Sequence, residues 1–318
     1  MKKWIRNLAG ITLGLFLLTV SVSAESLLIP VGRLIGLEVK NDTLTVVEPE
    51  RGECPAGIQP GDVLLKVNDT PVADPEDVHS VLNRADGSVQ LLLRRKEDLV
   101  QVKLTPQITS EGPRLGIYLK QGVTGVGTVT WYDPNSGKFG ALGHGVNSPD
   151  HTLAAMEQGT AYEAQVVAVK KGKSGDPGQL IGTISGKKPI GTLSKNAQQG
   201  IFGTAKNVFS GQELPVAGKD EIKKGPATIV STISGNTPQE YSVEILKVYP
   251  TSASAGRNLL LKVTDAALLE ATGGIVQGMS GSPIIQDGKL VGAVTHVLVN
   301  DPTTGYGIFI ENMLDAAA

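Results

Sequence analysis

The segment 278–283, GMSGSP, places two serines among glycines, directly ahead of an apolar run. A serine hydroxyl becomes a nucleophile only beside a base, which in turn needs an orienting acid. It also needs backbone N–H groups directed at the developing oxyanion, and flanking glycines allow the required turn. The segment therefore predicts Ser280 as nucleophile, the amides of Gly278 and Ser280 as oxyanion donors, and Ser282 bonded or packed within the turn. The alternative is a simple tight turn between strands.

His144 is the candidate base, because it stands between two glycines in the segment 141–146, ALGHGV. Flanking glycines indicate tight backbone packing around a deliberately placed side chain. His151, in a Ser-Pro-Asp-His segment, is expected at the surface. His296 alternates with apolar neighbours, so Thr295 and His296 are expected to form a wall of the substrate cleft. The alternative for His296 is a strand histidine with its hydrogen bonds satisfied.

The orienting acid is less constrained by the residues alone. Asp265 follows the apolar run 259–263 and precedes AALLE, so its simplest role is the N-cap of a short helix. On spacing alone it competes for the role of acid with Asp133, Asp176, Asp220 and Asp301.

Residues 107–318 are expected to form one mainly β unit. Short β-type runs separated by glycines predict strands at 125–131, 165–169, 181–184, 227–233, 241–248, 259–263 and 290–299. Strands at this spacing are typical of a sandwich or a pair of barrels. The candidate base and nucleophile come from opposite halves of the unit, which suits a cleft between two half-barrels. The segment 172–186, rich in Gly, Ser and Lys, is expected to be a mobile surface loop.

Residues 27–106 predict a smaller β-rich domain, with strands at 44–47, 63–67 and 89–93 and a helix over 75–83 capped by Asp74. The stretch 56–68, AGIQPGDVLLKVN, resembles the core of PDZ domains. PDZ domains add a peptide to a sheet edge, and their backbone N–H groups hold its terminal carboxylate. By position, Ile35, Gly36 and Leu37 are the candidate peptide-binding residues. The alternative is a small β domain that binds no ligand.

The composition excludes several classes of function. The chain of 318 residues is long enough for two domains, and its 39 glycines favour short strands and loops. A formal net charge of −2 gives no indication of a nucleic-acid partner. The single cysteine, Cys54, excludes an internal disulfide framework and any multi-Cys metal site, and the four histidines lack ligand spacing. We expect no metal and no cofactor.

The N-terminus predicts export. Lys2, Lys3 and Arg6 precede the apolar run 8–20, and small residues at 22–24 are typical of a cleavage site. Residues 1–24 are therefore expected to be a signal peptide or an N-terminal membrane anchor. Export without a disulfide favours a bacterial source.

Several segments together closely resemble the SpoIVB serine peptidase family of endospore-forming bacteria. They are GHG at 143–145, VTD at 263–265, TGGIVQGMSGSPI at 272–284, GAVTHV at 292–297 and NDPTTGYG at 300–307. The resemblance implies a PDZ-like domain followed by a chymotrypsin-like peptidase domain of the double β-barrel type. It also implies His144 as base, Asp265 as acid and Ser280 as nucleophile. Because Asp265 lies so close to Ser280 in the chain, a different carboxylate or an altered topology remains an alternative.

The resemblance further implies a biological role. Members of the family are secreted from the forespore into the space between the two sporulation membranes. There they cleave themselves and a membrane-bound regulator, which frees an intramembrane protease to process the precursor of a late mother-cell sigma factor. The PDZ domain would hold the peptidase to itself or to its membrane target. The alternative is a non-catalytic exported PDZ adaptor in which GMSGSP is only a turn.

Overall fold

The structure is a computed structural model that describes residues 26–52, 54–148, 152–251 and 256–318. The expected signal peptide or anchor at 1–24 and His151 lie outside these residues. Within the described ranges, no helix is both long and apolar enough to cross a bilayer.

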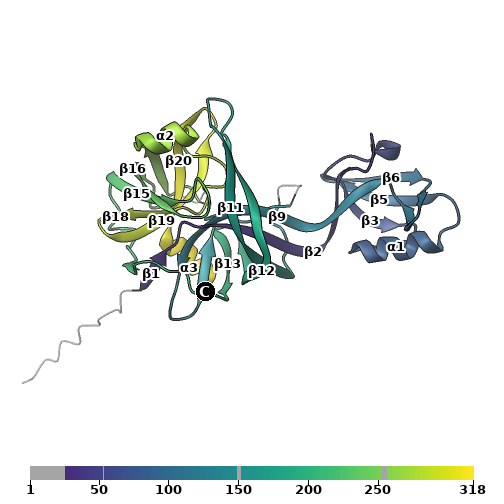
Figure 1. The fold of residues 1–318 in the computed structure, drawn as a ribbon, viewed down its shortest axis with the longest axis horizontal. Helices are drawn as coiled ribbons and strands as arrows, with labels where there is room; N and C mark the ends of the chain where they lie inside the picture. The colour runs from purple at the N-terminus through teal and green to yellow at the C-terminus, as the bar shows by residue number, and fades with distance from the viewer. Residues whose placement is uncertain (1–25, 53, 149–151, 252–255) are drawn as a thin grey trace, which may run out of the picture.

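The first barrel of the larger part of the chain is a ring of antiparallel strands (Figure 1). In order around the ring it contains β2 (Leu34–Pro49), β9 (Ile117–Tyr132), β10 (Lys138–Ala141), β13 (Gly200–Ala205), β12 (Gln179–Ala197) and β11 (Gln158–Lys170). The pairing of β2 with β9 closes the ring. At its edge, β1 (Leu27–Pro30) joins β9 to β14 (Leu214–Pro215). Apolar side chains such as Val39, Phe139 and Ile201 fill its interior.

The second barrel is closed in the same antiparallel manner. Its ring contains β15 (Gly225–Ser231), β16 (Gln239–Val248), β17 (Leu259–Val263), β20 (Asp301–Phe309), β19 (Lys289–Leu298) and β18 (Pro283–Gln286). Helix α2 (Ala266–Thr272) follows β17, and helix α3 (Ile310–Ala317) ends the chain against the seam between the barrels. The predicted mainly β fold with a double barrel is confirmed.

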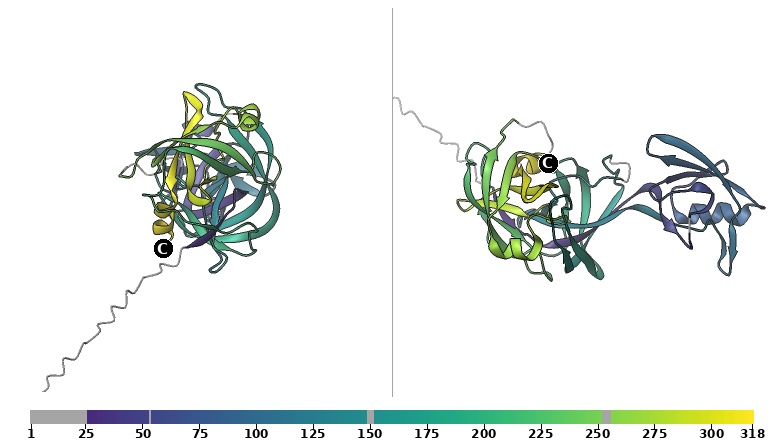
Figure 2. Two further views of the ribbon diagram at one scale, coloured as in Figure 1. Left: turned by 90° about the vertical axis from the view of Figure 1, so that its left-hand side faces the viewer. Right: turned by 90° about the horizontal axis from the view of Figure 1, so that it is seen from above.

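The PDZ lobe stands apart from the barrels in the view from above (Figure 2, right). It contains β3 (Val63–Val67), β4 (Thr70–Pro71), α1 (Pro75–Arg84), β5 (Val89–Arg95), β6 (Asp98–Leu104), the short helix η1 (Pro55–Gly57) and the hairpin β7 (Gln107–Thr109) to β8 (Gly112–Arg114). Asp74 caps α1 as expected, because its side chain accepts a hydrogen bond from the Asp77 amide at 2.8 Å.

The lobe is inserted into the first barrel, since the long strands β2 and β9 run through both parts. Their pairing shifts register between Val39 and Leu44, and Gly122 faces that point. A Cβ on Gly122 would lie 2.0 Å from the Val39 carbonyl oxygen, so only glycine fits at this crossing.

The domain boundaries consequently differ from the prediction of 27–106 and 107–318. Ile29 and Ile35 belong to the core of the first barrel, whereas Leu115 and Ile117 belong to the core of the PDZ lobe. A continuous strand crosses each boundary without a linker, and a linker is the feature by which a sequence usually marks one. The predicted loop 172–186 is also partly wrong, because β12 begins at Gln179 and pairs with β11.

Candidate active site

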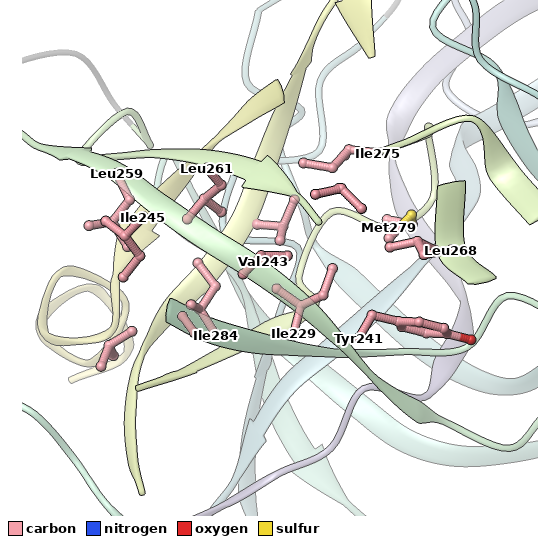
Figure 3. Packing of buried hydrophobic residues seen from close by; sticks show 14 of the residues in the cluster. Ile229, Tyr241, Val243, Ile245, Leu259, Leu261, Leu268, Ile275, Met279 and Ile284 are labelled. Carbon is pink, nitrogen blue, oxygen red and sulfur yellow. The ribbon is translucent and has the colours of Figure 1, made fainter. Parts of the chain in front are cut away.

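The loop 273–282 carries the candidate nucleophile between α2 and β18. Met279 is fully buried in the core of the second barrel (Figure 3). The Ser282 hydroxyl donates to the Met279 carbonyl at 2.7 Å and bonds the Ser231 hydroxyl at 2.9 Å. The predicted role of Ser282 within the turn is thus confirmed. Met279 and Ser282 are thus held on either side of Ser280, which is itself half-buried and lines a cleft.

The backbone amides of this loop alternate between bonded and free. The amides of Gln277, Met279, Gly281 and Ser282 each donate to a backbone carbonyl. Those of Gly278 and Ser280 have no acceptor among the hydrogen bonds recorded for the described residues. Gly278 adopts a φ of +98°, a conformation that favours glycine. The two amides predicted to bind an oxyanion are therefore the ones available for it.

Thr128, fully buried in β9, joins the two barrels at this point. Its amide donates to the Ser280 carbonyl at 3.1 Å, and its hydroxyl donates to the Gly278 carbonyl at 2.9 Å. Its own carbonyl accepts from the Leu142 amide at 3.1 Å, just ahead of His144. Sequence analysis could not predict this role, because a threonine is common in an apolar strand.

His144 follows β10 after two residues in left-handed backbone, Leu142 at φ +72° and Gly143 at φ +70°. A Cβ on Gly143 would lie 2.9 Å from Cγ2 of Thr295, which is the tight packing that the flanking glycines predicted. Nδ1 of the His144 ring lies 2.9 Å from the carbonyl oxygen of Gly145. The ring is thereby held in a fixed orientation.

One cleft of about 560 Å³ brings most of the predicted residues together. It is lined by Gly278, Ser280, His144, Thr295 and His296, among others. The Ser280 hydroxyl donates to the Thr295 carbonyl at 2.7 Å in this structure, and no hydrogen bond between Ser280 and His144 is recorded. Hydrogen bonds between a nucleophile and its base are often loose before substrate binds.

His296 stands beside the candidate base. The two ring centroids are 5.6 Å apart, at an interplanar angle of 39°. Burial, followed by the positive charges of neighbouring His144 and Arg257, lowers the pKa of His296 to about 4. Its buried Nδ1 has no hydrogen-bond partner among the described residues. His296 thus lines the cleft, is neutral at pH 7, and has an unsatisfied ring nitrogen among the described residues. Its role as a wall of the substrate cleft stays a prediction.

The pH dependence of the reaction should follow the protonation of His144. Burial lowers the pKa of His144 below its ordinary 6.5, and the hydrogen bond to Gly145 partly opposes this shift. Only the neutral imidazole can accept a proton, so activity is lost as pH falls through the pKa of the folded protein. We therefore expect the acid midpoint of kcat/KM to lie below pH 6.5. A pH profile with a midpoint at or above 6.5 would contradict this assignment.

Asp265 is not brought to His144. It stands at the start of α2, where its carboxylate accepts from the Leu268 amide at 2.9 Å and the Ser242 amide at 3.3 Å. It does not line the cleft. The structure therefore gives Asp265 the capping position that the sequence also allowed, and its role as orienting acid stays a prediction.

The rival carboxylates also lie elsewhere in the described structure. Asp133 bonds Ser136, Asp176 pairs with Lys170, and Asp301 bonds two neighbouring threonines. None of these, nor Asp220, lines the cleft.

The prediction assigned Ile35, Gly36 and Leu37 to the peptide-binding groove of the PDZ domain, but they lie elsewhere. They lie in the barrel section of β2, paired with both β9 and β11, and Leu37 lines the catalytic cleft. Ile35 is 1% exposed and cannot contact a peptide. The prediction was wrong because the apolar-Gly-apolar pattern recurs along the chain, and the copy at 35–37 belongs to the barrel.

Another copy of this pattern, Leu115-Gly116-Ile117, lies in the PDZ lobe beside α1. Leu115 and Ile117 line a groove of about 340 Å³ together with other residues, among them Val78, His79, Leu82, Arg114 and Tyr118. This groove, open between a helix and a strand, is the peptide-binding candidate that the sequence analysis missed. The repeated pattern was the signal that could have found it.

Two family models match parts of this chain. The family model of the SpoIVB peptidase S55 matches residues 111–314, and a PDZ domain model matches residues 54–95. Among curated proteins, the chain is 25% identical over 245 residues to a putative zinc metalloprotease, R01501, of Rhizobium meliloti (strain 1021). That match covers 75% of this chain and 60% of the relative's length. In the described part of this chain, no three His, Cys, Asp or Glu side chains are grouped so that they could hold a metal ion.

Among solved structures, the active form of the Rv3671c protease from M. tuberculosis aligns with a TM-score of 0.39 and 15% identity, covering 62% of this chain and 75% of that one. The HtrA-type protease AlgW with a decapeptide aligns with a TM-score of 0.37 and 11% identity, covering 92% and 63%. The S55 model spans more than half of the sequence. The chain therefore belongs to the SpoIVB peptidase S55 family of serine peptidases and carries a PDZ domain.

Proposed function

We propose that this chain is an exported serine endopeptidase in which Ser280 is the nucleophile and His144 the general base. The observation that carries the proposal is one cleft holding His144, Ser280 and two unbonded amides of a glycine-rich loop. A turn with no chemical role would have no reason to keep the Gly278 and Ser280 amides free beside an imidazole.

The reaction follows from these positions. The Ser280 hydroxyl leaves the Thr295 carbonyl by rotation about χ1 and attacks the substrate carbonyl carbon, while Nε2 of His144 takes its proton. The Gly278 and Ser280 amides stabilise the oxyanion. His144 then gives the proton to the leaving amine, and water hydrolyses the acyl-enzyme.

The biological part of the proposal is the role implied by the family. The chain would act between the two sporulation membranes, cleaving itself and a membrane-bound regulator so that a late mother-cell sigma factor precursor is processed. Support comes from the family match, from the N-terminal sequence and from a PDZ lobe that could bind protein targets. Replacing the chromosomal copy with Ser280→Ala should block processing of that precursor, as followed by immunoblot. Normal processing would instead favour the non-catalytic adaptor.

Peptide binding by the PDZ lobe gives a separate prediction. Arg114 lies at the end of β8, next to the Leu115-Gly116-Ile117 turn, and lines the groove. If a terminal carboxylate binds there, Arg114→Glu should weaken binding about ten-fold, because reversing one exposed charge a few ångströms away costs about 1–2 kcal/mol. Fluorescence anisotropy with labelled peptides ending in a free or an amidated C-terminus measures this. Lys103→Glu, an exposed reversal on β6, is the matched control. Equal weakening by both variants would show a general charge effect.

A further inference from the structure

The only recorded hydrogen bond of the His144 ring within the described structure joins Nδ1 to the Gly145 carbonyl, at 2.9 Å. A carbonyl oxygen can only accept, so the neutral ring must carry its proton on Nδ1. Nε2 then has a free lone pair, which is the tautomer that a serine nucleophile needs in its base. In Ser–His–Asp enzymes a carboxylate enforces this tautomer.

Among the described residues, no carboxylate has a recorded hydrogen bond to the His144 ring, and none lines the cleft. Among the described residues, His296 of β19 stacks near the His144 ring, and Ser280 of the nucleophile loop lines the same cleft. Arg257, in the segment 256–258, lowers the pKa of His296 by its positive charge. None of them is an acid. The oxygens of Asp265 accept instead from the amides of Leu268 and Ser242.

The segment that carries the Gly145 carbonyl is clamped by Asn196, at the end of β12. The Asn196 side-chain oxygen accepts from the Val146 amide at 2.9 Å. Its amide group donates to the carbonyls of Val146 and Ala154, both at 2.8 Å. A single side chain thus makes three hydrogen bonds to the two ends of one loop.

The backbone at Gly145 packs closely against the end of β12, where Asn196 lies. A Cβ on Gly145 would lie 2.3 Å from Cδ1 of Leu153 and 2.8 Å from the Ala197 carbonyl oxygen. The loop therefore packs directly on the strand end that carries Asn196, with no room for a side chain between them. Displacing Asn196 would displace the peptide unit that the imidazole binds.

We infer that the Gly145 carbonyl orients the catalytic imidazole and that Asn196 is a positioning residue holding that carbonyl in place. The inference rests on the proposed function, because it assigns a role within the same active site. In this arrangement the dipole of the Gly145 peptide orients the imidazole, where other serine peptidases use a charged carboxylate. The side-chain amide of Asn196 holds that peptide in place because it both donates and accepts hydrogen bonds.

The direct test is the tautomer of His144 in the full chain, read by long-range ¹H–¹⁵N NMR on protein labelled at histidine. Comparison with the spectrum of His144→Gln assigns its signals. At pH 8 we expect the Nδ1–H form. A dominant Nε2–H form in the wild type would overturn the inference, whatever any variant does.

The variant test removes the clamp without emptying its volume. Asn196→Leu should mix the two tautomers and lower kcat/KM about 10²-fold, the cost of a small misplacement of a catalytic group. It should also move the acid midpoint of kcat/KM to lower pH, because the hydrogen bond to Gly145, which raises the pKa of His144, is weakened while the ring stays buried. The control is Gln198→Leu, an exposed amide two residues away that makes no recorded bond. Unchanged tautomer and activity in folded Asn196→Leu would overturn the inference.

A third variant separates this arrangement from a hidden carboxylate. Asparagine caps helices about as well as aspartate, so Asp265→Asn should keep the fold and leave the His144 tautomer unchanged. A tautomer shift in Asp265→Asn would make its carboxylate the orienting group and overturn the inference. Failure of the proposed function is recognised separately, as a wild type that forms no fluorophosphonate adduct on Ser280 while the tautomer is still measurable.

Discussion

Ser280→Ala should lower kcat for peptide hydrolysis about 10⁶-fold while leaving the protein folded. The hydroxyl is half-buried and makes one side-chain hydrogen bond, to the Thr295 carbonyl, so its loss costs only about 1 kcal/mol of stability. The catalytic loss is much larger because nucleophile and base act as a unit, and neither replaces the other.

The measurement uses the full Ser280→Ala chain as substrate and catalytic amounts of wild type as enzyme, followed by intact mass. A fluorophosphonate should add to wild type at Ser280 and not to the variant. Ser210→Ala, which removes an exposed hydroxyl far along the chain, is the control and should cleave and label normally. Equal labelling of Ser280→Ala and wild type would show that another residue is the nucleophile.

Gly281→Ala should disable the site by a different route, through the backbone. Gly281 has φ +97°, and a Cβ there would lie 2.0 Å from the Thr128 carbonyl oxygen and 2.6 Å from the Leu142 nitrogen. Those two atoms bond each other at 3.1 Å and connect β9 to the turn before His144. The methyl group therefore cannot be accommodated unless the nucleophile loop moves away from the base.

We expect Gly281→Ala to lose about 3 kcal/mol of stability or more, since overpacking adds to left-handed strain, and to react with fluorophosphonate at least about 10²-fold more slowly. Gly288→Ala provides the matched control. Gly288 also has positive φ, at +75°, but no atom lies within 4 Å of its would-be Cβ, so only strain of about 1–2 kcal/mol is expected. Urea unfolding and labelling rates measure both variants. Similar losses in the two would show that the close approach at Gly281 is unimportant.

Short-range chemistry explains what could be predicted. The α1 cap at Asp74, the strand at 63–67 and the turn role of Ser282 depend on neighbours in the chain, so a local pattern was sufficient to predict them. The glycines beside His144 and Ser280 likewise indicated tight packing, because left-handed backbone and close approach both require glycine.

Contacts between distant segments could not be predicted in this way. Thr128 binds the nucleophile loop across 150 positions of sequence, and Asn196 binds Val146 across 50. Neither residue type is unusual in its own strand. The insertion of the PDZ lobe could not be predicted for a related reason. The sequences of β2 and β9 look like those of ordinary strands, although each strand contributes side chains to both the barrel core and the PDZ core.

The sequence by itself determined the chemical inventory of this protein: a serine on a glycine-rich turn, a histidine between glycines, a mainly β chain and a PDZ core. Only the tertiary structure decided which groups meet. It brings His144 and Ser280 into one cleft and places Asp265 at the N-terminus of α2. It also places the candidate peptide-binding groove beside residues 115–117 instead of 35–37. The physical reason is that side-chain chemistry and local turns are encoded in neighbouring residues. Orientation within the site depends instead on backbone hydrogen bonds between strands that meet only when both barrels have closed.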